Sequence, residues 1–543
     1  FMLGDYLESR TIEKTRSSIK ALLDMAPDKA RVRRNGEETE INPEDVVKGD
    51  FIVVKPGEKI SVDGTVVEGS AYINQAAITG ESIPISRAVD ETVFSGTIIE
   101  SGYLVIRADR VGEDTTFARI LQMVEDAQDK KAKTQKFLEK FSRYYTPAII
   151  LLSIALFLAT KDVVLALTLL VIACPGALVI SAPVSIVAGI GNGAKQGVLI
   201  KGGEIMEKLG AVKAVAFDKT GTLTVGKPSV TRAEPVGISE DELLRIAAVG
   251  ESYSEHPLGK AIITTATQKL GPISETPEDA EILSGHGLRF SLDGTTYFIG
   301  NRKLFTENGI SVDRHESYLQ SEEKKGQTAV IVGTAEGVCG IISIADTVRP
   351  DARTLISDLE SRGIKTTVML TGDNRRAAEA IALETGIREV HSELLPEDKV
   401  RVLAELRERY GSVAMVGDGV NDAPALASSD LGIAVGGAGK DIAMETADVV
   451  LLSEGIKKLS YAVGLSRATV RNMKQNIAFA LLVAAFLLAG VLAKTVTLSF
   501  GMLVHEVSVL LVILNAIRLL RYGETKKAGT VLSSEGEIVG GQM

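Results

Sequence analysis

The sequence lacks the features of a disulfide-rich or nucleic-acid-binding protein. It contains only two cysteines, Cys174 and Cys339, and two thiols cannot build a disulfide framework. Tryptophan is absent, aromatic residues make up 5% of the chain, and the formal net charge is −10. Because no basic patch interleaved with aromatic side chains is found either, we do not expect a nucleic acid as a partner.

Hydrophobic residues, in contrast, are more frequent than is usual for a soluble protein with this share of charged residues. They make up 45% of the 543 residues, charged residues make up 24%, and the mean hydropathy is +0.17. The length is sufficient for three or four domains. Each long apolar stretch could alone be a buried core helix, but their arrangement as two hairpins with very short loops favours membrane spans. The four stretches are residues 144–160, 163–194, 475–493 and 495–517.

Positive charges gather at the ends of these stretches that lead into the rest of the chain. The positive-inside rule therefore places residues 4–143 and 195–474 on the cytoplasmic side of a membrane. The charges are Lys131, Lys133, Lys136, Lys140, Arg143, Lys195, Lys201, Arg467, Arg471, Lys474, Arg518, Arg521, Lys526 and Lys527.

The most informative motif follows the apolar stretch of residues 211–217. It reads Asp218-Lys219-Thr220-Gly221-Thr222-Leu223-Thr224. Open α/β sheets place their ligands at the carboxyl ends of strands, which is where this aspartate is expected. A single aspartate after a strand could be an ordinary turn or helix cap. The full seven-residue run instead resembles the phosphorylation motif of the P-type ATPases, which form an aspartyl-phosphate.

Similar strand-to-turn signals recur along the chain. Residues 366–370 lead into Thr371-Gly372-Asp373, and residues 413–416 lead into the ten-residue run Gly-Asp-Gly-Val-Asn-Asp-Ala-Pro-Ala-Leu at 417–426. Lys399 lies in a run that opens a helix between them, and Glu81 lies in a Thr-Gly-Glu-Ser turn within the β-rich residues 30–112. Together with the motif at Asp218, these runs resemble those of the P-type ATPases.

The resemblance implies a multidomain α/β membrane protein. It would combine a helical transmembrane bundle, a β-rich actuator domain, a haloacid-dehalogenase-like α/β phosphorylation domain and an inserted α+β nucleotide-binding domain. The expected parts are a membrane-proximal helix (1–29), the actuator domain (30–125), a transmembrane hairpin (126–209), the phosphorylation domain (210–225 and 345–455), the nucleotide-binding domain (226–344), a second hairpin (456–522) and a cytoplasmic tail (523–543).

The resemblance also assigns catalytic roles. Asp218 would attack the γ-phosphate of ATP, Lys399 and Thr371 would contact the phosphoryl oxygens, and Asp422 would support the site. Glu81 would orient water against the phosphoenzyme. Mg²⁺ would be held by Asp218, Asp418 and the backbone carbonyl of Thr220.

One substitution within the motif affects turnover. Hydrolytic enzymes with the same core carry a second aspartate two residues after the nucleophile, where this chain has Thr220. The phosphoenzyme would then lack a built-in acid and would persist until Glu81 arrives from another domain.

Candidate ATP contacts lie in two regions. Those in the insert resemble the nucleotide-binding domain of heavy-metal pumps, in which glycines allow close approach of the backbone. A lone His-Pro pair is most often a loop histidine, but the later Gly-His-Gly favours the nucleotide interpretation. The expected contacts are Glu251, His256, Gly285 and Gly287 in the insert, with Gly372 and Asp373 in the phosphorylation domain.

Polar side chains inside the apolar stretches suggest what is transported, because ionisable or thiol groups within a span are costly. Cys174 precedes Pro175, which removes a backbone N–H and opens the helix. His505, Glu506 and Ser508 lie near the middle of the fourth stretch. Such a mixture of soft, intermediate and hard ligands suits a divalent transition metal. The structural alternatives are a proline-kinked core helix and a buried His-Glu pair.

The motif Cys174-Pro175 and the later Gly202-Gly203-Glu204 resemble the heavy-metal-transporting (CPx-type) branch. Copper pumps usually have Cys-Pro-Cys and a Tyr-Asn pair in the third of these spans, whereas zinc and cadmium pumps have a lysine there and an aspartate in the last span. Neither pattern is present. The run that begins at His505 is closer to the His-Glu-Gly-Gly/Ser motif of cobalt, zinc or iron exporters, although Val507 replaces glycine.

The resulting hypothesis is ATP-driven export of a divalent ion of the Zn, Cd, Co or Fe class. The alternatives are a Cu⁺ exporter and a non-transporting, truncated form that only binds nucleotide and metal. A soluble phosphatase is disfavoured by Thr220 and by the four spans.

The family usually has four membrane helices before the actuator domain. This chain opens at Phe1 with what resembles the end of the last of them, so we expect a piece without those helices. We further expect a monomeric multi-pass protein of a bacterial plasma membrane, with the metal ion and the lipid bilayer as partners.

Overall fold

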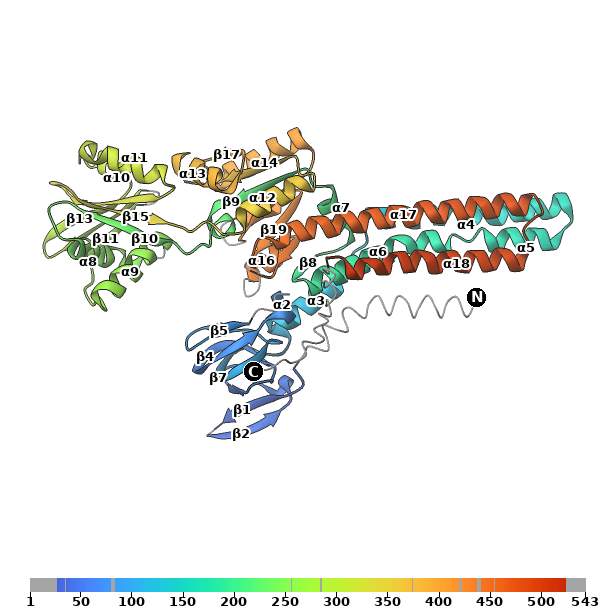
Figure 1. Cartoon of the computed structure of the whole chain (residues 1–543), viewed down its shortest axis with the longest axis horizontal. Helices are drawn as coiled ribbons and strands as arrows, with labels where there is room; N and C mark the ends of the chain where they lie inside the picture. Colours follow the sequence, from blue (N-terminus) through green and yellow to red (C-terminus); the bar gives the residue numbers. More distant parts are fainter. Residues whose placement is uncertain are drawn as a thin grey trace, which may run out of the picture.

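The structure is a computed structural model. It describes residues 27–34, 36–79, 84–254, 256–283, 286–373, 375–418, 422–436, 441–453 and 455–523. Glu81, Gly285, most of the predicted membrane-proximal helix and nearly all of the predicted tail lie outside the described residues. Three lobes lie at one end of a long helical bundle (Figure 1).

The first lobe is an antiparallel sheet with the strand order β2-β1-β3-β7-β4-β5, and β6 pairs with β4. Alternating apolar residues such as Ile60, Val66, Ile73 and Ile106 fill its core. The β-rich lobe predicted from residues 30–112 is therefore present. Its strands are β1 (Ala30–Arg34), β2 (Glu37–Ile41), β3 (Phe51–Val54), β4 (Asp63–Asn74), β5 (Ile85–Arg87), β6 (Thr92–Val93) and β7 (Ile98–Arg110), with the short helix α2 (Ala76–Thr79) between β4 and β5.

The second lobe has a seven-stranded sheet with the order β17-β16-β9-β18-β19-β20-β8. All neighbours are parallel except β20 and β8. The continuous apolar sequences of the inner strands fit a sheet covered on both faces. The strands are β8 (Val198–Ile200), β9 (Ala214–Asp218), β16 (Thr366–Leu370), β17 (Glu389–His391), β18 (Val413–Gly417), β19 (Leu431–Val435) and β20 (Val449–Leu451), and the helices are α7 (Gly203–Ala211), α12 (Ala352–Ser361), α13 (Arg375–Thr385), α14 (Pro396–Tyr410), α15 (Ala423–Ser428) and α16 (Asp441–Thr446).

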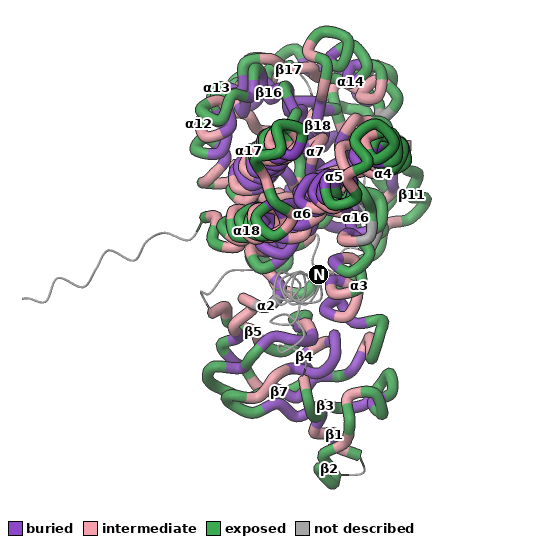
Figure 2. The backbone as a smooth tube through the Cα atoms, turned by 90° about the vertical axis from the view of Figure 1, so that its right-hand side faces the viewer, coloured by how far each residue is buried: buried purple, intermediate pink, exposed green. Residues whose placement is uncertain are grey.

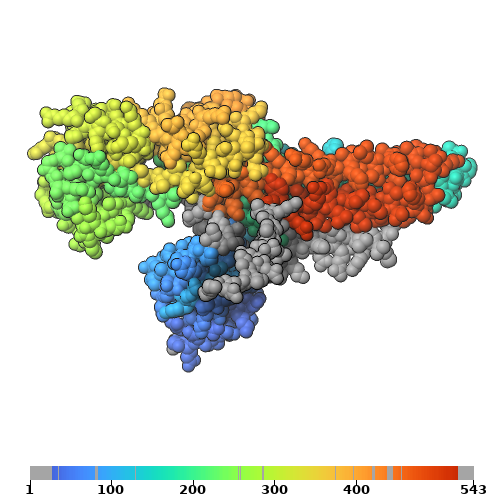
Figure 3. Space-filling model, viewed as in Figure 1, coloured from blue at the N-terminus to red at the C-terminus, as the bar shows by residue number. Residues whose placement is uncertain are grey.

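The third lobe is inserted between β9 and β16 and has its own antiparallel sheet and its own core around Phe290 and Ile299. Figure 3 shows it as a separate body joined to the second lobe. Its elements are β10 (Ser229–Pro235), α8 (Glu240–Gly250), α9 (Pro257–Leu270), β11 (Glu278–Leu283), β12 (Gly287–Leu292), β13 (Thr295–Gly300), α10 (Arg302–Glu307), α11 (Glu316–Lys324), β14 (Thr328–Thr334) and β15 (Gly337–Ala345).

The helical bundle confirms the four predicted spans, since four helices of the described chain are long and apolar enough to cross a membrane. Figure 2 shows α6 buried at its centre and α4 exposed at its edge. Exposed side chains such as Leu482, Phe486 and Leu503 suit contact with lipid. The helices are α3 (Thr116–Asp129), α4 (Lys133–Thr160), α5 (Val163–Ile172), α6 (Gly176–Lys195), α17 (Lys458–Leu492) and α18 (Leu498–Ile517).

Three details of the helices go beyond the sequence prediction. The chain breaks between α3 and α4, where Gly203 N–H donates a hydrogen bond to the Lys130 carbonyl. The second span is interrupted between α5 and α6, around Pro175. α17 extends well beyond the third predicted span and packs against α7 and α12 of the second lobe.

Candidate functional site

The predicted phosphorylation residues meet at the carboxyl ends of β9, β16 and β18. Asp218 is the last residue of β9 and pairs in register with Leu370, so Thr371 lies one residue beyond it on the neighbouring strand. Asp418 follows β18, on the other side of β9. A Cβ atom placed on Gly221 would lie 3.3 Å from the Asp418 Oδ2 atom, which shows how closely Asp418 approaches the motif. Parallel strand ends thus converge on Asp218.

Lys399, near the start of α14, joins two of these carboxylates. Its Nζ atom donates hydrogen bonds to Asp218 Oδ1 at 2.6 Å and to Asp422 Oδ1 at 2.7 Å. The three side chains are 13%, 10% and 1% exposed, so the charges interact in a poorly solvated environment. Burial, and then the nearby Asp422 charge, raise the pKa of Asp218 to about 7, against the lowering effect of Lys399.

The rest of the motif is held by ion pairs and backbone contacts. Lys219 pairs with Asp373, which follows β16. Thr224 Oγ1 donates to the Asp346 carboxylate, and Arg349 Nε donates to the Thr222 carbonyl at 2.9 Å. Our reading of the sequence missed Asp346 and Arg349. Their signal was the polar segment where the chain returns from the insert to the second lobe.

Two segments of the chain match known protein families. Residues 24–125 match the P-type ATPase actuator domain, and residues 212–430 match the haloacid dehalogenase-like hydrolases. A cadmium-transporting ATPase of Staphylococcus aureus is 45% identical over 96% of this chain and 74% of its own length. A copper-exporting P-type ATPase of S. aureus (strain JH9) is 38% identical over 95% of this chain and 65% of its own length.

A solved structure is also similar over nearly the whole chain. It is a zinc-transporting PIB-type ATPase in an E2.Pi state, 40% identical, with a TM-score of 0.59 over 93% of this chain and 83% of its own. This chain belongs to the heavy-metal-transporting P-type ATPases. It is therefore an ATP-hydrolysing ion translocase and a multi-pass membrane protein, as the motifs and the four spans predicted.

The predicted ATP contacts of this ATPase lie in the inserted lobe. Glu251 is buried after α8, and burial raises the pKa of its carboxyl. His256 begins α9, and its Nδ1 atom accepts a hydrogen bond from Leu258 N–H at 3.3 Å. A Cβ atom on Gly259 would lie 2.4 Å from Glu251 Oε2, so the glycine leaves room for this carboxylate.

Another predicted ATP contact, Gly287, lies at the start of β12, between β11 and β13 of the insert's sheet. Gly287 pairs with Gly300, and a Cβ atom on Gly287 would lie 2.0 Å from the Ile299 carbonyl oxygen. Asn301 N–H donates a hydrogen bond to the His286 carbonyl at 2.9 Å. Gly300 and Asn301 could not be predicted as site residues from the sequence, because a Gly-Asn pair is an ordinary turn signal. Of the two predicted contacts in the second lobe, Asp373 is paired with Lys219 and Gly372 precedes it.

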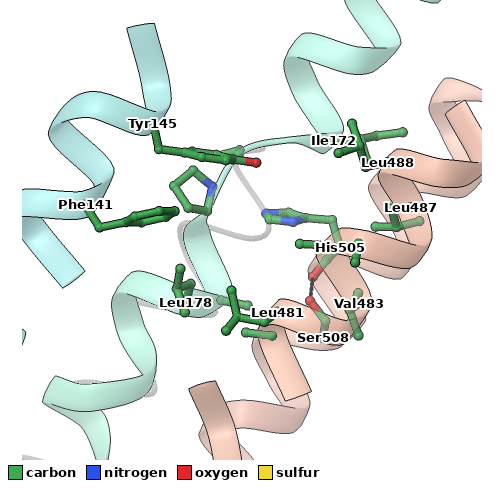
Figure 4. Close-up of a pocket in the computed structure, with 16 residues that line it drawn as sticks. Phe141, Tyr145, Ile172, Leu178, Leu481, Val483, Leu487, Leu488, His505 and Ser508 are labelled. Carbon is green, nitrogen blue, oxygen red and sulfur yellow. Dashed lines mark hydrogen bonds between the residues drawn. The ribbon is translucent and has the colours of Figure 1, made fainter. Parts of the chain in front are cut away.

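The bundle of this ATPase encloses a cavity of about 210 Å³ beside the break between α5 and α6 (Figure 4). Its wall includes Cys174, His505 and Ser508 but not Glu506. His505 lies over the start of α6, where a Cβ atom on Gly176 would be 3.2 Å from the His505 Nε2 atom. Ser508 Oγ donates to the His505 carbonyl at 2.6 Å. The structure thus brings three of the four predicted ion ligands to one cavity.

Proposed function

We propose that this ATPase exports a divalent transition-metal ion of the Zn, Cd, Co or Fe class and drives it with an aspartyl-phosphate on Asp218. The observation that carries the proposal is the meeting of Cys174 and His505 in one cavity inside the bundle. A thiolate and an imidazole together suit borderline divalent ions. The cadmium-transporting and zinc-transporting relatives support this choice of ion class.

Phosphoryl transfer would begin at Asp218. One carboxylate oxygen attacks the γ-phosphorus of ATP, the bond to the bridging oxygen breaks, and ADP leaves with that oxygen. Lys399, 2.6 Å from Asp218, would offset the negative charge of the phosphoryl group, and the Thr371 hydroxyl would contact its oxygens. Asp422 keeps the Lys399 ammonium in place.

The residues around Asp218 fit a magnesium ion. Asp218, Asp418 and Asp422 supply the hard oxygen donors that Mg²⁺ prefers, and Asp422 Oδ2 is buried with no hydrogen-bond partner among the described residues. Asp218, Asp418 and the backbone carbonyl of Thr220 would hold the ion, and Asp422 would support them. When bound, Mg²⁺ would offset the charge of the transferred group.

The remaining site residues complete the proposal. Glu251, His256, Gly285 and Gly287 would contact ATP from the insert, together with Gly372 and Asp373 from the phosphorylation domain. Because Thr220 replaces the usual acid, the phosphoenzyme would persist until Glu81 orients a water molecule against it. We also propose that the domains have the boundaries predicted from the sequence.

The proposed orientation follows from charge and arrangement. The lobes lie at one end of the bundle (Figure 1). In the sequence, the lysines and arginines that flank the spans stand at the span ends that lead into these lobes. The lobes would therefore be cytoplasmic, in a bacterial plasma membrane, and the protein would act as a monomer.

A metal-panel ATPase assay in lipid tests the proposal. We expect Zn²⁺, Cd²⁺, Co²⁺ or Fe²⁺ to stimulate ATP hydrolysis, and Cys174→Ala and His505→Ala to abolish that stimulation. Cys339→Ala, in β15 of the insert, is the matched cysteine control and should behave like the wild type. Stimulation by Cu⁺ alone would favour the copper alternative. Nucleotide and metal binding without metal-dependent turnover would favour a non-transporting form.

A further inference from the structure

The cavity in the bundle contains few of the usual metal ligands. Among the residues that the structure describes, Cys174 and His505 are the only cysteine and histidine of its wall, and none of the wall residues is a carboxylate. Structural and transported Zn²⁺-like ions prefer four ligands in a tetrahedral arrangement. Even with the Ser508 oxygen, one ligand is missing.

Tyr145 is the remaining wall residue with a side-chain oxygen. It comes from α4, so the cavity is lined by α4, the α5–α6 break, α17 and α18. In Figure 4 the Tyr145 ring extends over the break, and its hydroxyl end is turned toward the side of the cavity where His505 lies. Cys174 lines the same cavity as Tyr145. The hydroxyl therefore faces the same space as the thiol and the imidazole.

A second aromatic residue holds the Tyr145 ring in place. Phe141, four residues earlier on α4, stacks on it with a ring-centroid distance of 5.3 Å and an interplanar angle of 25°. Residues four apart lie on the same face of a helix. Tyr144, the adjacent tyrosine, is 68% exposed and does not line the cavity. The two neighbouring tyrosines therefore differ in whether the side chain lines the cavity.

We propose that the Tyr145 hydroxyl oxygen is a ligand of the transported ion and favours borderline divalent ions over Cu⁺. This inference rests on the proposed export function. With Tyr145, the cavity offers one sulfur, one nitrogen and two oxygen donors from three separate segments of the bundle. Cu⁺ prefers soft sulfur ligands and gains little from a phenol oxygen, whereas Zn²⁺, Cd²⁺ and Co²⁺ accept mixed sets.

Metal binding to the purified full chain in lipid tests the inference with one pair of variants. Tyr145→Phe removes only the hydroxyl and keeps the stack with Phe141, and Tyr144→Phe makes the same change outside the cavity. We expect Tyr145→Phe to weaken Zn²⁺ binding roughly ten- to a hundredfold. We expect no change in Cu⁺ binding and no effect of Tyr144→Phe. The visible spectrum of bound Co²⁺ should also change in Tyr145→Phe alone.

Two outcomes distinguish a failure of the Tyr145 inference from a failure of the proposed export function. If Tyr145→Phe binds Zn²⁺ and gives a Co²⁺ spectrum like the wild type, while Cys174→Ala and His505→Ala lose binding, Tyr145 is not a ligand and the export site stands. If Cys174→Ala and His505→Ala also bind like the wild type, the ion site itself lies elsewhere.

Discussion

The phosphorylation site and the membrane cavity are built in opposite ways. Around Asp218, buried charges are already joined by short hydrogen bonds to Lys399 before any substrate binds. In the cavity, no ion pair joins the wall residues in the part of the chain that the structure describes, and most of the wall is apolar. A catalytic site benefits from charges that are fixed in place before the substrate binds. A transport site must bind an ion and then release it, so its ligand side chains need to have few permanent hydrogen-bond or ion-pair partners.

The largest effect should come from removing the nucleophile. Asp218→Asn keeps the size and shape of the side chain but cannot form an acyl phosphate. We expect acid-stable labelling from γ-labelled ATP to disappear and metal-dependent ATP hydrolysis to fall to background. Zn²⁺ binding in the cavity should remain, because no cavity residue changes. Persistent acid-stable labelling in the variant would contradict the assignment of Asp218.

Removing the Lys399 ammonium group tests how far the phosphorylation site depends on ion pairs that exist before the substrate binds. Lys399→Met keeps much of the side-chain volume but leaves Asp218 and Asp422 without their shared cation. We expect the rate of phosphoenzyme formation to fall by roughly a hundred- to a thousandfold, as for loss of one preorganised donor. Rapid-quench measurement of phosphoenzyme formation checks this.

The matched control for Lys399→Met lies on the same helix. Arg401 is exposed and pairs only with Asp398 across one turn of α14, among the described interactions. Arg401→Met should therefore retain near-normal phosphorylation. An equal loss in both variants would point to a defect of α14 and not to the loss of the buried charge.

The two sites also differ in how far the sequence predicted them. The chemistry around Asp218 comes from several short runs that can each be recognised in the sequence, although Lys399 lies 181 residues from Asp218. Asp346 and Arg349 escaped because they belong to none of these runs, and only the folded chain brings them to the motif that they contact. The four spans follow from hydropathy, but the antiparallel addition of β8 to the sheet depends on long-range packing.

The cavity could be predicted only in part. Glu506 was grouped with His505 because the two are adjacent, yet successive helix residues point about 100° apart, and Ser508, three residues on, is the one that shares the cavity. Tyr145 was missed because a tyrosine near the end of a span usually lies in the interfacial aromatic belt. Only the packing of α4 against the break before α6 brings it into the cavity.

The pH dependence of Mg²⁺ binding should distinguish the charged site from the cavity. Burial and Asp422 raise the pKa of Asp218 to about 7 in the metal-free protein, whereas an unfolded aspartate titrates near ~3.9. The folded state therefore holds an extra proton between these values, and this contribution to stability falls as the pH rises through that window.

Magnesium must displace that proton, so its apparent affinity should fall by up to about tenfold for each pH unit below 7. We expect Mg²⁺ to raise the unfolding temperature more at pH 8 than at pH 6. Asp218→Asn should lose the pH-dependent part of this shift. A Mg²⁺ stabilisation that is equal at both pH values in the wild type would argue against a protonated Asp218.

The smallest effect should come from the contact that anchors α4, the helix carrying Tyr145. The Glu207 carboxylate on α7 accepts hydrogen bonds from the backbone N–H groups of Lys133 and Thr134, at 3.1 and 3.3 Å, and so caps the first turn of α4. Glu207→Ala should cost about 1 kcal/mol of stability, as for loss of a helix cap. Glu207→Gln, which keeps an acceptor oxygen, should cost less.

Because α4 lines the cavity and not the phosphorylation site, Zn²⁺ affinity should weaken slightly while phosphoenzyme formation from ATP stays unchanged. Thermal unfolding and metal titration of the two variants measure both effects. A loss of phosphorylation equal to the loss of metal binding would show that the phosphorylation site and the cavity are not independent.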